Sequence, residues 1–74
     1  MSTIEKLNSK YAGSAVTKLA NEGKWAEAAE LAGKSGMWGI WAECRAAGGL
    51  SANDADRAAL IAEVEAKRKA RFQK

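Results

Sequence analysis

The chain contains no proline, and alanine is its most common residue, at 17 of 74 positions. Alanine has the highest helix propensity, whereas proline breaks helices most strongly. The β-branched residues, which favour strands, number only seven. This balance excludes a β-sandwich, a collagen-like chain and a proline-rich linker, and it predicts an all-α fold.

The length predicts a single helical domain over residues 1–74. A domain of this size buries only about 60–65% of the surface that its unfolded chain exposes. Only 17 residues are large apolar or aromatic, and much of the remaining apolar content is alanine. Small cores of this kind are commonly completed by oligomerisation or by a partner, so a homo-oligomer or a complex is expected.

Histidine is absent, and Cys44 is the single cysteine. This composition excludes an internal disulfide and catalysis that depends on histidine, and it supplies no zinc ligand set. We therefore expect no enzymatic activity, no cofactor and no metal. The longest uncharged runs are eight residues, far below the roughly 20 that a membrane span needs. Residues 1–6 match neither a signal peptide nor an acylation motif, so a soluble cytoplasmic protein is expected.

The first helix is predicted to begin after Ser2, because Ser2 and Glu5 have capping-box spacing. Gly13 and Ser14 interrupt the apolar stripe that follows. Either the helix tolerates Gly13, or Gly13 ends a short helix and Ser14 caps the next. We expect the first alternative, a continuous or kinked helix to about Glu22. The stripe itself consists of Ile4, Leu7, Tyr11, Ala15 and Leu19.

Three further helices are predicted, which gives a compact array of about four helices. The second spans 25–32 and is expected to be closed by a left-handed Gly33. The third spans 37–47, with Ser35 as its expected N-cap and Gly48–Gly49 as its end. The two short middle helices should lie antiparallel because their connection is short. The last helix is expected to open around 51–53 and to run to near Phe72.

The segment 19–28 resembles the middle of a tetratricopeptide-type helical hairpin. In that family a glycine makes the turn, and an aromatic residue then precedes a packing alanine by three positions. Gly23, Trp25 and Ala28 match these positions. The matched segment is ten of the 74 residues, and the terminal proline of the family is absent. The resemblance implies a helical hairpin and a protein-binding role.

The three tryptophans form the first candidate site. Trp25, Trp38 and Trp41 lie within 17 residues, and Trp38 and Trp41 share one face of the predicted third helix. At least one of them is expected to fill the core, and one of Trp38 and Trp41 is expected to be exposed as an interface hot spot. The alternative is that all three fill the core. The predicted partner-binding residues are Trp38, Trp41, Met37 and Arg45. Cys44 is expected to pack as a small buried hydrophobe.

The C-terminal residues 67–74 form the second candidate site. They carry five basic residues and no acid, whereas the other 66 residues carry seven basic and nine acidic groups. Such a segment can bind nucleic-acid phosphates, or it can be a solvated helix end with Glu63–Lys67 and Glu65–Lys69 pairs. The candidate nucleic-acid contacts are Lys67, Arg68, Lys69, Arg71 and Lys74.

Together these features predict a non-enzymatic protein-binding module, a small adaptor or inhibitor that docks a tryptophan-bearing helix face on a partner protein. Its size and composition are typical of small accessory proteins of phages and mobile elements. The alternative is a nucleic-acid-binding accessory protein that uses residues 67–74. A third alternative is a structural subunit that self-associates through the tryptophan face.

Overall fold

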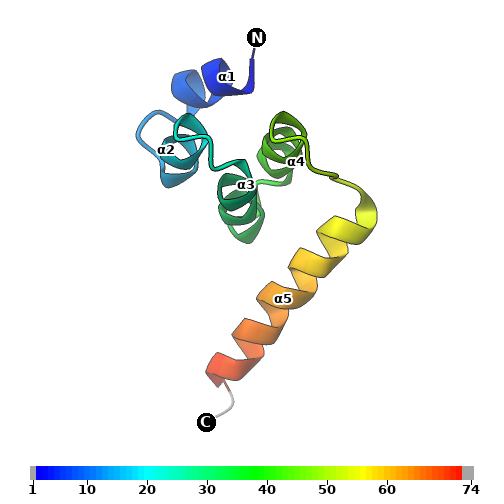
Figure 1. Cartoon of the computed structure of the whole chain (residues 1–74). Coiled ribbons are helices and arrows are strands. Elements are labelled where there is room, and N and C mark those ends of the chain that lie inside the picture. The colour runs from blue at the N-terminus through cyan, green and yellow to red at the C-terminus, as the bar shows by residue number, and fades with distance from the viewer. Residues whose placement is uncertain (1, 73–74) are drawn as a thin grey trace.

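The computed structural model describes residues 2–72, with side chains through Ala70. Within this part of the chain every regular element is an α-helix, which confirms the predicted all-α class (Figure 1). Residues 2–72 form five helices: α1 Thr3–Lys10, α2 Ala15–Asn21, α3 Trp25–Lys34, α4 Trp38–Ala47 and α5 Asp54–Phe72.

The extra helix arises because the chain breaks where a continuous first helix was expected. Helix α1 ends at Lys10, with Tyr11 as its C-cap, and Gly13 lies in the turn that follows, with a left-handed φ of 82° that favours glycine. Ser14 then caps α2, its hydroxyl accepting a hydrogen bond from the Thr17 N–H at 3.1 Å. The Thr17 hydroxyl also donates to the Tyr11 carbonyl at 2.6 Å, so the corner is held by a buried side chain.

The boundary between α3 and α4 also differs from the prediction. Gly33 does not close α3; it lies inside the helix and is buried, and α3 continues to Lys34. The left-handed residue is Gly36, with a φ of 79°. Ser35 is the C-cap of α3 rather than the N-cap of α4, and Met37 occupies the α4 N-cap without a side-chain hydrogen bond. The other ends agree with the prediction, with turns at Gly23 and Gly48–Gly49 and α5 beginning after Asn53.

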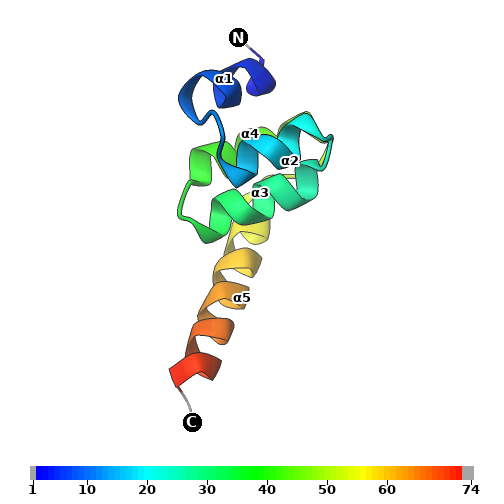
Figure 2. The same cartoon turned by 90° about the vertical axis from the view of Figure 1, so that its left-hand side faces the viewer.

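Helix α3 is the centre of the array. It packs against α2, α4 and α5, while α1 covers parts of α2 and α4 (Figures 1 and 2). Three alanines of α3 are completely buried, and their small side chains let the neighbouring helices approach closely. The buried apolar core consists of Leu7, Val16, Ala20, Ala28, Ala29, Ala32, Ile40, Trp41, Cys44 and Leu60.

Helix α5 extends well beyond this core. Its 19 residues correspond to a length of about 28 Å. Leu60 is its buried residue, and Asp56, Ile61 and Val64 are partly buried. Residues 65–70 are all exposed, and Figure 2 shows this end of the helix projecting away from α1–α4. Among the side chains described, through Ala70, the array therefore contacts only the first half of α5.

Candidate functional site

Trp41 is a core residue. Its side chain is 4% exposed, and its ring meets that of Trp38 edge to face, with centroids 5.4 Å apart and planes at 79°. This geometry is favourable for two aromatic rings. The expectation that at least one tryptophan fills the core is thus confirmed, and the Trp41 ring is removed from the expected docking face.

Trp38 is only partly buried, and α5 covers one side of it. The Arg57 guanidinium lies over the Trp38 ring, 5.0 Å from its centroid, in a cation–π contact. Leu60, one turn further along α5, packs where Gly33 leaves space between α3 and the two indoles. The chain's own C-terminal helix therefore occupies part of the face that the sequence assigned to a partner.

The remaining edge of Trp38 lies between two surface grooves. A groove of about 210 Å³ separates the α3–α4 corner from α5, where Ile61 and Val64 line it. A second groove of about 360 Å³ lies between α1 and the start of α4, where Tyr11 and Met37 line it. Gly36 and Trp38 line both grooves, so the two are adjacent. We call the apolar residues of this surface the Trp38 band: Tyr11, Met37, Trp38, Ile61 and Val64.

Basic groups lie along the edges of the Trp38 band. Lys6 is paired with Glu43 at 2.9 Å, and Lys34 is paired with Glu30 at 3.0 Å. Lys10 lines the groove at α1 and Arg68 lines the groove at α5. Within the described residues neither Lys10 nor Arg68 forms an ion pair.

The start of α4 adds to this positive character. Its N-cap makes no side-chain hydrogen bond, and its first turn contains no acidic residue. The first N–H groups of a helix carry a partial positive charge when no side chain caps them. Gly39, in this first turn, is exposed and lines the groove beside Met37.

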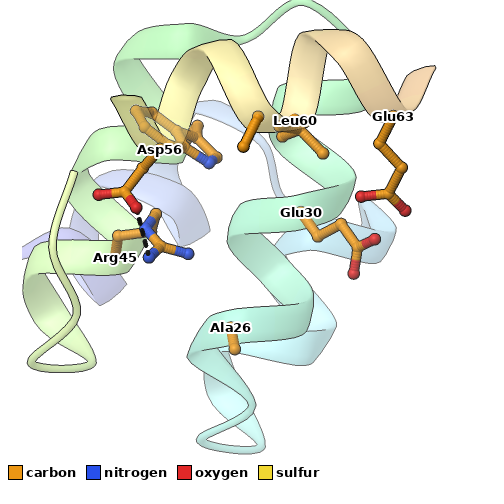
Figure 3. Close-up of a pocket in the computed structure, with 8 residues that line it drawn as sticks. Ala26, Glu30, Arg45, Asp56, Leu60 and Glu63 are labelled. Atoms are coloured by element: carbon orange, nitrogen blue, oxygen red, sulfur yellow. Dashed lines mark ion pairs between the residues drawn. The ribbon is translucent and has the colours of Figure 1, made fainter. Parts of the chain in front are cut away.

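Arg45 lies on the other side of α5, in a separate groove of about 360 Å³ (Figure 3). Its Nη2 is 4.0 Å from Asp56 Oδ1, its Nε donates to the Ser51 carbonyl, and its guanidinium lies 5.7 Å from the Trp41 centroid. These contacts tie α4 to the start of α5. Arg45 is therefore already engaged within the chain, on a different surface from Met37 and Trp38.

Asp56, the ion-pair partner of Arg45, also accepts hydrogen bonds at the start of α5. The Ser51 hydroxyl donates to it at 2.6 Å, the Asn53 N–H donates at 3.3 Å, and both bonds lower the pKa of the Asp56 carboxyl, with a further contribution from the Arg45 charge. The Asn53 side chain in turn accepts from the Asp56 N–H at 2.9 Å. This reciprocal pair is a capping box that starts α5.

Glu30 and Glu63 line the far end of the same groove, as Figure 3 shows. Each is paired with a lysine one turn along its own helix, Lys34 and Lys67. The Glu30 contact raises the pKa of Lys34. Across residues 2–72, no cluster of three or more acidic or cysteine side chains is arranged to hold a metal ion.

Cys44 is completely buried, as expected for a packing residue. Burial raises the pKa of its thiol, and the charge of Glu43 raises it further. A buried thiol with a raised pKa is a poor nucleophile. Cys44 therefore belongs to the core.

The basic end of α5 is solvated over the part that the structure describes. Lys67, Arg68 and Lys69 are exposed. Lys67 pairs with Glu63 at 3.5 Å as expected, whereas the equally spaced Glu65 and Lys69 do not reach ion-pair distance. Arg71 lies in α5, but its side chain falls outside the described residues, as does all of Lys74.

The sequence did not single out Arg57, Gly33 or Tyr11 as functional residues. Arg57 had a detectable signal, because it lies three residues before Leu60 and so shares its helix face. Gly33 and Tyr11 gave no such signal, because their roles depend on contacts with other helices.

Comparison with known proteins gives no family assignment: no family model, curated protein or solved structure matches this chain. Among residues 2–72, no helix has both the length and the apolar character needed to cross a bilayer. The candidate site therefore depends on its geometry alone.

Proposed function

We propose that this chain is a non-enzymatic protein-binding module, a small adaptor or inhibitor, and that it docks a partner through the Trp38 band. The observation that carries this proposal is the position of Trp38. Its ring is fixed on one side by Trp41 and Arg57, while its remaining edge lines two adjacent surface grooves.

A tryptophan held in this way is well suited to be an interface hot spot. Hot spots are enriched in tryptophan and lie at the centre of a patch from which neighbouring residues exclude water. An anchor that is already ordered loses little conformational entropy on binding. Met37 on one side and Ile61 with Val64 on the other supply the surrounding apolar surface.

Site-specific photo-crosslinking in the producing cell tests this proposal. A benzoylphenylalanine at Met37 should yield a discrete crosslinked product with one protein. The matched control is the same group at Lys18, which is exposed on α2. Equal crosslinking at both positions, or none at Met37 in a protein with unchanged helical circular dichroism, would refute docking through the band.

A nucleic-acid-binding role for residues 67–74 is the second candidate. The supporting observation is that α5 projects beyond the array with Lys67, Arg68 and Lys69 exposed (Figure 1). Anisotropy of a labelled mixed-sequence duplex tests it at 50 and 200 mM salt. This role requires binding that weakens steeply with salt and disappears when residues 67–74 are removed. Absence of binding at the lower salt eliminates this role.

A further inference from the structure

We infer that the segment bound by the Trp38 band is an acidic amphipathic helix of a partner protein. This inference rests on the protein-binding role proposed above and specifies the chemistry of the partner. Two properties of the surface lead to it: the arrangement of its apolar residues and the sign of the charge at its edges.

The apolar residues fit one face of a helix. The two grooves meet at Gly36 and Trp38, so apolar side chains occur from Tyr11 at α1, past the α4 N-terminus, to Ile61 and Val64 on α5. Grooves of this kind receive the i, i+3/i+4 and i+7 side chains of an amphipathic helix. Gly36 has no side chain, so it leaves space between the grooves for such a helix.

The edges favour acidic residues on that helix. The cations Lys6, Lys10, Lys34 and Arg68 line the two grooves, against the acids Glu43 and Glu65. Lys6 is paired with Glu43, and Lys34 is paired with Glu30. The charges that remain are Lys10 at the α1 groove, and Arg68 and Glu65 at the α5 groove. The uncapped start of α4 lies between them and adds a partial positive charge.

The same charges disfavour a second copy of this chain. The helical segment that projects from the array is the end of α5, which carries Lys67, Arg68 and Lys69. Its approach to a basic edge would bring like charges together. An acidic partner helix meets complementary charge at both ends and apolar surface between them.

Binding of designed peptides tests the inference. The probe is an 18-residue labelled helical peptide with leucines at i, i+4, i+7 and i+11 and glutamates at flanking positions. The comparison peptides replace every glutamate with glutamine or with lysine. We expect the glutamate peptide to bind about tenfold more tightly than the glutamine peptide in fluorescence anisotropy, and the lysine peptide to bind more weakly than both.

Charge-reversal variants of the protein locate the interaction. Lys10→Glu and Arg68→Glu should each weaken binding of the glutamate peptide about three- to tenfold, because each replaces an attraction with a repulsion. Lys18→Glu is the matched control, since it makes the same charge change on exposed α2 and should leave affinity within twofold.

The outcomes separate this inference from the proposed function. If the glutamine peptide binds as tightly as the glutamate peptide, or if Lys18→Glu weakens binding as much as the edge variants, the inference is wrong. Competition by a mixed-sequence duplex at equal charge concentration would also overturn it, in favour of general polyanion binding. If position 37 crosslinks to a protein but the glutamate and glutamine peptides bind with equal affinity, the inference is wrong and the proposed function stands. If both measurements are negative, the proposed function fails with it.

Discussion

Substitution of Gly33 with alanine should destabilise the protein, although alanine is normally the better helix residue. Gly33 lies within α3, directly beneath α5. A Cβ at this position would overlap the Leu60 side chain and would lie 3.1 Å from Trp41 Cδ1 and 3.2 Å from Trp38 Cζ3. Rotation of Leu60 relieves one of these contacts but not the two with the indoles.

The magnitude follows from two opposing effects. Overpacking a core costs about 1–3 kcal/mol, and the overlap at three side chains places this site in the upper half of that range. Alanine gains about 1 kcal/mol over glycine in a helix interior. We therefore expect Gly33→Ala to lower the free energy of unfolding by about 1–2 kcal/mol.

Urea denaturation followed by circular dichroism at 222 nm measures this change. Gly39→Ala is the matched control, because Gly39 lies in helix α4 and a Cβ there meets nothing within 4 Å. That variant should raise the free energy of unfolding by up to about 0.5 kcal/mol, less than the value for a helix interior because Gly39 lies in the first turn. The two glycine-to-alanine changes should thus have opposite signs.

A stability of Gly33→Ala equal to or above that of the unsubstituted protein would refute this packing of α5. A double-mutant cycle gives an independent check. Leu60→Ala alone should cost about 2–3 kcal/mol as a buried leucine, but it should cost at least about 1 kcal/mol less in the Gly33→Ala protein. Additive effects of the two substitutions would show that the side chains do not meet.

Three further predictions concern the corner at Thr17, the capping box of α5 and the buried thiol. Thr17→Val should lower the free energy of unfolding in urea by about 1 kcal/mol, because it removes the 2.6 Å hydrogen bond to the Tyr11 carbonyl, which keeps the Ser14 N–H as its other donor; an unchanged midpoint would contradict this role. The folded-state pKa of Asp56 lies below the ordinary 3.8, so its stabilising contribution is complete above that pH and is lost as the pH falls through the lower folded value. In Asp56→Asn the free energy of unfolding should therefore fall less steeply as the pH is lowered below about 4 than in the unsubstituted protein. The same pH dependence in both proteins would argue against the capping box. Cys44 should react with a disulfide reagent only in urea concentrations that unfold the protein, whereas rapid reaction of the native protein would show that the thiol is accessible.

The helices themselves were largely determined by the sequence. Alanine content, the absence of proline and local capping residues act within a few positions of the chain. Ser2 caps α1 as its spacing predicted, and α5 runs from Asp54 to Phe72 as expected. Burial of Cys44 also followed from its place on an apolar helix face.

The helix breaks required the tertiary structure. A glycine is compatible with a helix interior, a helix end or a turn, and sequence gives no measure of which neighbour needs the space. Gly13 lies in the turn between α1 and α2, where the Thr17 hydroxyl holds the corner, whereas Gly33 stays inside α3 because Leu60 packs against it. The sequence prediction had these two glycines the other way round.

The tertiary structure also determined which residues form the candidate site. Trp38 and Trp41 are equivalent in helix position, so the sequence assigned both to one docking face. Packing separates them: Trp41 is enclosed in the core, while Trp38 is held by Arg57 and retains an edge in the surface grooves. Local propensity determines where helices form. The burial of a side chain depends on which other helix packs against it, so the exposure of Trp38 is determined only when α5 packs against α3 and α4.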